Sequence, residues 1–272
     1  ITGSISQGTL QGNVYLKFTG DPSLTLNDLN QLMGQLSKNG ISHIQGNIIV
    51  DRSTYSGPTY PAGWMSDDKY FCYGAPADPI ILNQNCLYFT LDLKGQSRVV
   101  QHRDAIANYF TIRNHLKFVN NENPKNCHFS AVFQANHVID LDGCLPNHQS
   151  WPLNLAVQSP ASLITAYLQQ YLTTTHLSLS GDIQFGVMPS QVKIFATHHS
   201  APLFQLLRVM LANSNNLYAE TLSKMVGKVY TGTGSPEAGA SATVQIIRKL
   251  TKKPFSQLQM VGGSGCSYNN LN

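Results

Sequence analysis

Apolar side chains recur at helical spacing in five stretches of the chain. This periodicity predicts helices at 26–36, 159–171, 203–211, 217–226 and 235–250. The second and the last stretch open with Ser-Pro, in which the serine caps the helix and the proline occupies its first turn. The first and the fourth stretch are each closed by a glycine, a residue common at helix C-caps. The pattern therefore predicts helices near both ends of the chain.

Alternating apolar and polar residues on either side of the first helix predict a β-α-β unit. Residues 13–18 are typical of one strand, and residues 44–50 of a second. We expect the two strands to pair in parallel with a right-handed crossover. No glycine-rich phosphate loop is present, so we do not expect this unit to bind a nucleotide.

Short alternating runs in the middle of the chain predict a mainly-β segment. Expected strands lie at 87–93, 109–113, 117–119, 129–133 and 138–141. Three more are expected beyond the second helix, at 177–179, 183–185 and 193–196. The loop at 56–79 is rich in Gly, Pro, Tyr and Asp, and loops of this length are often functional.

Composition argues against several classes of function. The 272 residues carry a formal net charge of +4 with 12% charged residues, and lysines and arginines do not cluster. We therefore do not expect nucleic-acid binding. No run of 18 apolar residues occurs, so we expect no transmembrane segment. The chain opens with Ile-Thr-Gly-Ser and shows no signal peptide, as in a mature or truncated chain.

Five cysteines occur, and none forms the Cys-x-x-Cys pattern of zinc or thioredoxin-type sites. Cys72 and Cys86 flank one turn-rich segment, and Cys127 and Cys144 flank another. We expect two local disulfides, Cys72–Cys86 and Cys127–Cys144, with Cys266 free. Disulfides imply an oxidising compartment. Five buried thiols remain the alternative, because sequence does not determine pairing.

A polar Ser-x-Asn, Ser214 to Asn216, interrupts the two consecutive apolar helices. Its side chains could point into a cleft. Serine and asparagine are also ordinary helix N-caps, because their side-chain oxygens accept backbone N–H groups. The motif alone does not indicate a catalytic role, which depends on evidence from the rest of the chain.

Eight segments in the same order along the chain resemble one family. The chain is similar to the D-alanyl-D-alanine carboxypeptidase/endopeptidases of the class C low-molecular-mass penicillin-binding proteins. The matching segments lie at 12–24, 44–51, 61–64, 73–76, 155–158, 200–203, 214–220 and 263–267. They are distributed over nearly the whole chain. Each segment alone is a weak match, but the eight together are specific for this family.

The resemblance implies an α+β multidomain fold. A transpeptidase/β-lactamase-like α/β domain would be interrupted by a mainly-β domain, which itself carries the small β-α-β module. Residues 1–9 would lead in from the catalytic domain, and residues 10–75 would form the β-α-β module. Residues 76–185 would form the mainly-β insert, and residues 186–272 part of the catalytic domain.

The resemblance also implies a serine-type D-Ala-D-Ala carboxypeptidase. Such an enzyme acts in the bacterial periplasm on peptidoglycan stem peptides, through an acyl-serine and without a metal or cofactor, and β-lactam antibiotics acylate it. Its nucleophile comes from Ser-x-x-Lys, and a Lys-Thr-Gly strand binds the substrate carboxylate. In this scheme the Ser214 hydroxyl relays a proton, and Asn216 orients the lysine and the substrate amide.

Substrate contacts are implied for Asp68, Tyr73 and Ser264. Asp68 lies where the family has an acidic residue suggested to recognise an amino group of the peptide, although a solvated loop carboxylate is the alternative. Two residues past Cys266 the family often has arginine, whereas this chain has Tyr268. That difference puts a carboxylate-binding role there in doubt.

The chain departs from the family at both ends. In the family, Ser-x-x-Lys precedes the segment with which this chain begins, and no Lys-Thr-Gly follows Asn216 here. Residues 66–69 fit Ser-x-x-Lys, but they lie where the family has its acidic loop. We therefore expect the chain alone to be inactive. The alternative is a non-catalytic peptidoglycan-binding or scaffold protein derived from that family.

Overall fold

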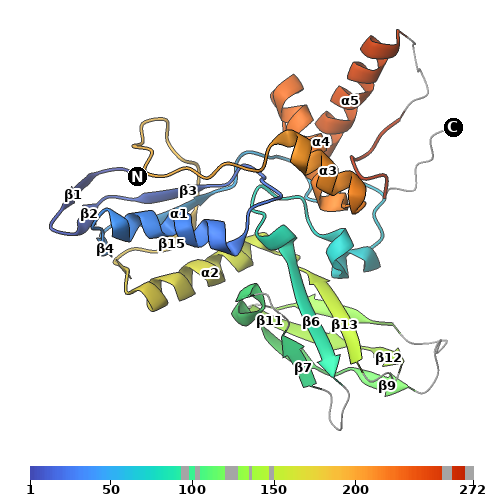
Figure 1. The fold of residues 1–272 in the computed structure, drawn as a ribbon, viewed down its shortest axis with the longest axis horizontal. Helices are drawn as coiled ribbons and strands as arrows, with labels where there is room; N and C mark the ends of the chain where they lie inside the picture. The colour runs from blue at the N-terminus through green and yellow to red at the C-terminus, as the bar shows by residue number, and fades with distance from the viewer. Residues whose placement is uncertain are drawn as a thin grey trace.

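The computed structural model describes residues 1–92, 98–101, 105–119, 128–134, 137–146, 150–252 and 259–266. Figure 1 shows three groups of elements. The N-terminal strands and helix α1 form one end, a strand-rich lobe lies beside them, and three C-terminal helices lie at the opposite end. The observed architecture is a mixed α+β fold, as the sequence predicts.

The predicted β-α-β unit is present. Strand β3 (Val14–Lys17), helix α1 (Leu26–Lys38) and strand β5 (Ile48–Asp51) follow one another, and β3 pairs with β5 in parallel. Thr25 caps α1 in a capping box with Asp28. The second strand of the unit was predicted as one run at 44–50. It is instead two short strands in different sheets, β4 (His43–Ile44) and β5.

Late segments of the chain complete the sheets of this unit. Strand β14 (Ser178–Leu179) pairs with β4, and strand β15 (Ile183–Phe185) pairs with β5, both in parallel. The first sheet has the order β1-β2-β4-β14, with β1 at Ser4–Ser6 and β2 at Thr9–Gln11. We therefore propose that residues 177–185, expected in the mainly-β insert, belong with the β-α-β module.

The middle of the chain is mainly β, as predicted. Strands β13 (Ser150–Ala156), β6 (Cys86–Asp92) and β7 (Arg98–Gln101) form an antiparallel sheet. A second sheet has the order β10-β11-β8, from Ser130–Phe133, Val138–Asp142 and Thr111–Asn114. Strand β12 (Cys144–Pro146) pairs with β9 (Lys117–Val119). Short 3-10 helices lie at Asp67–Tyr70, Cys72–Gly74, Asn83–Asn85 and Ala105–Tyr109.

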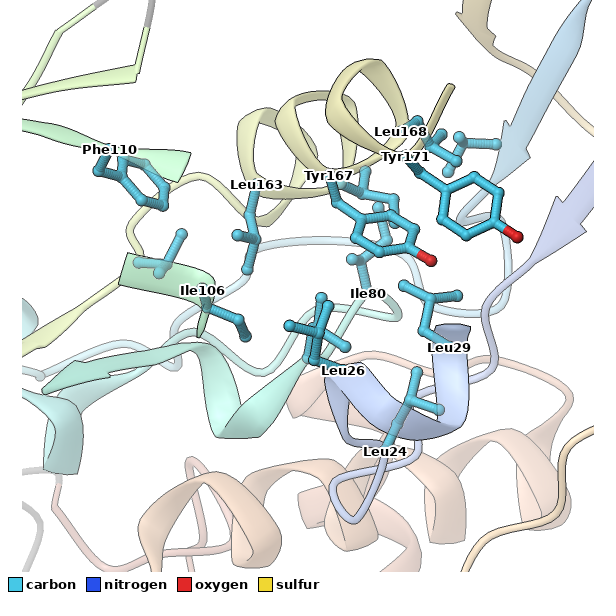
Figure 2. Packing of buried hydrophobic residues seen from close by; sticks show 14 of the residues in the cluster. Leu24, Leu26, Leu29, Ile80, Ile106, Phe110, Leu163, Tyr167, Leu168 and Tyr171 are labelled. Carbon is cyan, nitrogen blue, oxygen red and sulfur yellow. The ribbon is translucent and has the colours of Figure 1, made fainter. Parts of the chain in front are cut away.

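Helix α2 (Pro160–Thr175) joins the strand-rich lobe to the β-α-β unit. Its Tyr167 hydroxyl donates to Asn30 Oδ1 of α1 at 2.9 Å. Figure 2 shows Leu163 and Tyr167 of α2 facing Leu26, Leu29, Ile80 and Ile106. These residues belong to a single cluster of buried apolar side chains that extends into both parts. The two parts therefore share one core.

Three helices follow an extended segment near the end of the chain: α3 (Leu203–Ala212), α4 (Asn216–Thr231) and α5 (Pro236–Thr251). Two predictions were wrong here. Gly227 does not end a helix, because α4 continues to Gly232, whose φ of 83° provides the C-cap. Residues 193–196 form no strand, because only Lys193 exchanges backbone hydrogen bonds, with Ile1.

Candidate functional site

The turn between α3 and α4 places Ser214 in a conformation that glycine usually occupies. Ser214 has a φ of 50°, and the Asn215 N–H donates to the Met210 carbonyl at 2.9 Å across the end of α3. This is the geometry of a helix C-cap that favours glycine, because a Cβ is unfavourable at positive φ. The serine is exposed. Conformational preference therefore does not account for a serine at this position.

Asn216 begins α4 and is bonded to the loop that carries Asp68 and Tyr73. Its Nδ2 donates to the Tyr73 carbonyl at 2.9 Å. The side-chain amide has two N–H groups and one carbonyl oxygen. One N–H therefore fixes the orientation of the amide, and among the described residues its other hydrogen-bonding groups have no partner.

Tyr73 and Asp68 form a pair at the edge of this loop. The Tyr73 hydroxyl donates to Asp68 Oδ1 at 2.8 Å. Partial burial of the hydroxyl and its bond to the carboxylate raise the pKa of Tyr73 to about 12, with a smaller contribution from nearby Cys266. Tyr73 therefore remains a proton donor at neutral pH and keeps Asp68 oriented.

Glu220, one turn after Asn216, binds the segment that contains Ser264. The Glu220 side chain is 2% exposed. It accepts from the Gly263 N–H at 3.0 Å, from the Ser264 N–H at 2.9 Å and from the Ser264 hydroxyl at 2.6 Å. Three bonds to a buried carboxylate satisfy a charge that would otherwise be costly to bury. Ser264 is thereby fixed to the same helix as Asn216.

Lys224 lies one turn after Glu220 on α4 and is also a buried polar residue. The side chain is 1% exposed, and its Nζ donates to the carbonyls of Pro58, Thr59 and Ala77 at 3.2, 3.1 and 2.7 Å. Burial lowers the pKa of Lys224 to about 8, and neighbouring carboxylates, Glu220 first among them, oppose the shift. Residues at i, i+4 and i+8 share one helix face. One face of α4 thus anchors the loop at 56–79, through Asn216 and Lys224, and the segment at 263–264, through Glu220.

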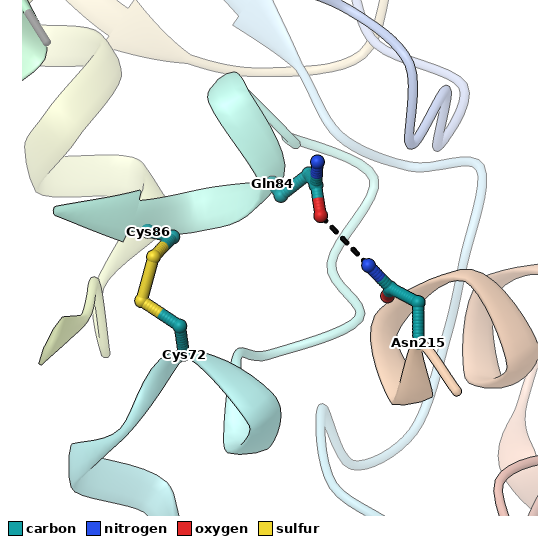
Figure 3. The surroundings of a disulfide bond; sticks show 4 residues. All are labelled: Cys72, Gln84, Cys86 and Asn215. Atoms are coloured by element: carbon teal, nitrogen blue, oxygen red, sulfur yellow. Dashed lines mark hydrogen bonds between the residues drawn. A yellow bond between two sulfur atoms is a disulfide. The ribbon is translucent and has the colours of Figure 1, made fainter. Parts of the chain in front are cut away.

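A disulfide between Cys72 and Cys86 ties the Tyr73 loop to the start of β6, as predicted (Figure 3). The predicted Cys127–Cys144 bond stays a prediction, because Cys127 lies outside the described residues. Cys266 has a free thiol. Among the described residues, no group of three or more His, Cys, Asp or Glu side chains is placed to hold a metal ion.

The structure therefore brings all five predicted site residues to the N-terminal half of α4 or to loops that this helix holds. Ser214 and Asn216 lie at its start, Asp68 and Tyr73 lie in the loop bonded to Asn216, and Ser264 is bonded to Glu220. The sequence profile of the D-Ala-D-Ala carboxypeptidase 3 (S13) family matches residues 1–271. The chain belongs to the S13 family.

Two D-alanyl-D-alanine carboxypeptidases are similar to this chain. The chain is 28% identical to D-alanyl-D-alanine carboxypeptidase DacB of Haemophilus influenzae over 99% of its own length and 57% of the relative. It is 23% identical to the D-alanyl-D-alanine carboxypeptidase of an Actinomadura species over 95% of its length and 50% of the relative. The chain thus spans about half the length of these S13 relatives.

A solved S13 structure has the same fold. The crystal structure of penicillin binding protein 4 (dacB) from Haemophilus influenzae superimposes with a TM-score of 0.87 at 28% identity, covering 98% of this chain and 60% of that one. The same protein complexed with a β-lactam gives a TM-score of 0.78 at 26% identity. Within the described residues, no helix is long and apolar enough to span a membrane.

Two segments fit the Ser-x-x-Lys pattern, and neither has the geometry of a nucleophile. The Ser66 hydroxyl donates to Asp67, and the Lys69 ammonium lies 4.9 Å from the centre of the Tyr60 ring. Residues 190–193, Ser-Gln-Val-Lys, also fit the pattern, although they lie outside the segments that resemble the family. They lie in the extended segment before α3 and begin no helix. A shared helix face, which would bring such a serine and lysine together, is absent at 190–193.

Two residues of the site were not predicted to have a role. Glu220 was only part of the matched segment, and Lys224 lay outside it. Both are charged positions within an apolar helix, four residues apart and in phase with Asn216. That spacing is the signal that could have identified them, because a charge on a buried helix face requires partners.

Proposed function

We propose that this chain forms one wall of the cleft of a serine-type D-Ala-D-Ala carboxypeptidase/endopeptidase. The whole enzyme would act on peptidoglycan stem peptides through an acyl-serine, and β-lactams would acylate the same serine. S13 membership supports the reaction class. A relative of similar fold that was crystallised with a β-lactam supports the class of inhibitor.

The observation that carries the proposal is the hydrogen bond from Asn216 to the Tyr73 carbonyl. It joins the Ser-x-Asn turn to the Asp68–Tyr73 loop across 143 residues of sequence. Ser264 is fixed to the same helix through Glu220. A peptide lying in this cleft would meet hydroxyl, amide and carboxylate groups from three separate segments.

Each side chain has a role in the proposed chemistry. The nucleophilic serine would come from Ser-x-x-Lys in a part of the enzyme that this chain lacks, and would attack the penultimate D-Ala carbonyl. The C–N bond breaks, and the leaving D-alanine nitrogen takes a proton. The exposed Ser214 hydroxyl would relay that proton. The free part of the Asn216 amide would hold the substrate amide, and Asp68 would bind a cationic group of the stem peptide.

An uncovered apolar surface supports the placement of this chain within a larger domain. On α3, Leu203, Phe204 and Leu211 are 61%, 68% and 74% exposed, and only Leu206 is buried. A helix that is apolar on most of its faces is normally covered. We propose that the remainder of the S13 catalytic domain covers α3, and that the chain without it is inactive. The disulfide favours an oxidising compartment such as the periplasm.

The test is D-alanine release from a peptide that ends in D-Ala-D-Ala, measured with the complete protein that the gene encodes. Asn216→Ala should lower kcat by about 10²–10³-fold, the effect of losing one oriented donor in an active site. Asn213→Ala is the matched control, because Asn213 is an exposed asparagine three residues away. If the complete protein releases no D-alanine and takes up no β-lactam, a non-catalytic scaffold replaces the proposal.

A further inference from the structure

A groove of about 520 Å³ lies beside the Ser-x-Asn turn, and the proposed chemistry does not use it. It is lined by residues 22–27 and Asn30 around the start of α1, by Asn83 and Gln84, by Tyr88 of β6 and by Tyr218 of α4. None of its eleven lining residues carries a charge. Its volume falls within the range of about 300–1,000 Å³ typical of small-molecule sites.

The floor of the groove is a strained turn that the core holds in place. Three consecutive residues, Asn83, Gln84 and Asn85, have φ of 46°, 58° and 50°. Left-handed backbone costs about 1–2 kcal/mol per ordinary residue, although asparagine tolerates it better. Buried Asn85 holds the turn, because its side chain bonds three backbone groups, and the disulfide follows at Cys86. Strain that the surrounding structure maintains in this way is common at binding sites.

The strained turn directs Gln84 toward the catalytic motif. Asn215, the middle residue of the Ser-x-Asn motif, donates from Nδ2 to Gln84 Oε1 at 2.7 Å (Figure 3). Asn215 also caps α4, accepting from the Tyr218 N–H. Asn215 of the motif is therefore bonded to two residues that line the groove, Gln84 and Tyr218. A ligand in the groove would be adjacent to whatever occupies the cleft.

Uncharged hydrogen-bonding groups are available along the groove. The Asn27 side chain has no hydrogen-bond partner among the described residues. Asn30 Oδ1 accepts from Tyr167, and Gln84 Oε1 accepts from Asn215, so the NH2 group of each remains free to donate. Tyr88 is 39% exposed and contributes an aromatic surface. Amides that donate and accept, beside an aromatic ring, match a ligand with hydroxyl and amide groups on a partly apolar ring.

We propose that this groove binds a neutral N-acetylated sugar unit of the glycan to which the stem peptide is attached. The identity of that glycan rests on the proposed function. A charged ligand is disfavoured, because no lining residue would compensate its desolvation. Since the groove adjoins the Ser-x-Asn turn, a sugar there and a peptide in the cleft would be neighbours, as the two parts of one polymer are. The groove would therefore select peptides that are still attached to glycan.

The test is titration calorimetry of this chain with the trisaccharide of N-acetylglucosamine. We expect saturable binding that Asn27→Ala weakens about 3–10-fold, the effect of one hydrogen bond. The substitution replaces a poor helix former in α1 by alanine, so misfolding would not explain the loss. Gln31→Ala, an exposed position on the same helix outside the groove, should leave the affinity unchanged. Tyr88→Ala should also weaken binding.

Three results would overturn the proposal. One is the absence of saturable sugar binding, and another is equal binding by the wild type, Asn27→Ala and Tyr88→Ala. The third is tighter binding of a blocked, uncharged dipeptide than of the sugar, which would make the groove a peptide subsite. The titration requires no catalytic serine. A failure of sugar binding alongside intact D-alanine release would therefore refute only the sugar site.

Discussion

Lys224 offers a quantitative test of how α4 is anchored. Its ammonium group is buried and donates to the backbone carbonyls of Pro58, Thr59 and Ala77. Burial lowers its pKa from 10.5 to about 8. Because the folded chain holds this proton less tightly than the unfolded chain, protonation of Lys224 opposes folding. The perturbation is Lys224→Met, which keeps much of the apolar stem and removes the titrating group.

The magnitude follows from linkage between protonation and folding. In the window from about pH 8 to 10.5 the unfolded chain binds more protons at this position, so the free energy of unfolding rises with pH. The full effect is about 3 kcal/mol, of which about 2 kcal/mol develops between pH 7 and about pH 9.5. Burial raises the pKa of several tyrosines, Tyr55 and Tyr167 among them, so the free energy of unfolding falls as the pH approaches and passes their ordinary value of 10.0. The wild type and Lys224→Met share this contribution, so it cancels in the comparison.

The assay is urea unfolding at pH 7 and at about pH 9.5, followed by tryptophan fluorescence. The wild type should gain about 2 kcal/mol more than Lys224→Met over this interval. Loss of the three hydrogen bonds lowers the stability of Lys224→Met at both pH values. The quantity to compare is therefore the change in the free energy of unfolding between the two pH values. Lys228→Met, an exposed lysine one turn further along α4, should behave as the wild type does. Equal pH dependence in the wild type and Lys224→Met would refute the argument.

Three further predictions concern the same framework. Glu220→Gln should accelerate hydrogen exchange of the two amides that Glu220 binds by roughly 10–100-fold, because a bond to a charged group contributes about 1.5–3 kcal/mol; unchanged exchange would contradict this. Gly239→Ala should lower the free energy of unfolding by about 1–3 kcal/mol, because its Cβ would lie 2.4 Å from a carbonyl of α4. Gly34→Ala is the control and should not lower the free energy of unfolding, because nothing lies within 4 Å of the added Cβ. Replacing Cys72 and Cys86 by serine should cost about 3 kcal/mol for a loop of this length, and an unchanged urea midpoint would exclude that contribution.

Local patterns were sufficient to predict most of the elements. The Ser-Pro pairs predicted the starts of α2 and α5, where Ser159 and Ser235 cap the helices as expected. Pairing between distant strands was not predictable, because a short alternating run does not specify its partner. Strand β15 pairs with β5 at a separation of 135 residues. Only the folded chain shows that β15 pairs with a strand of the β-α-β unit.

The candidate site was predicted in part, and for different reasons at different residues. Ser214 and Asn216 were identified from a motif whose resemblance to a family gave it meaning. Glu220 and Lys224 were passed over, because a charged residue in a helix is usually on the solvated face. Their role depends on loops at 58–59, 77 and 263–264, which reach α4 only in the folded chain. The four-residue spacing could mark both residues as buried, but it does not show which distant segments they bind.

The most direct test of the central claim is intact mass after incubation with excess benzylpenicillin, for this 272-residue chain and for the complete protein that its gene encodes. We expect no adduct on the chain alone, because the Ser66 hydroxyl is bonded to Asp67 while Lys69 lies over the Tyr60 ring, and because Ser190 begins no helix. The complete protein should gain the mass of one penicillin. A covalent adduct on the 272-residue chain would contradict the account, since a nucleophile would then lie within it. The absence of an adduct on the complete protein would contradict the enzymatic function itself.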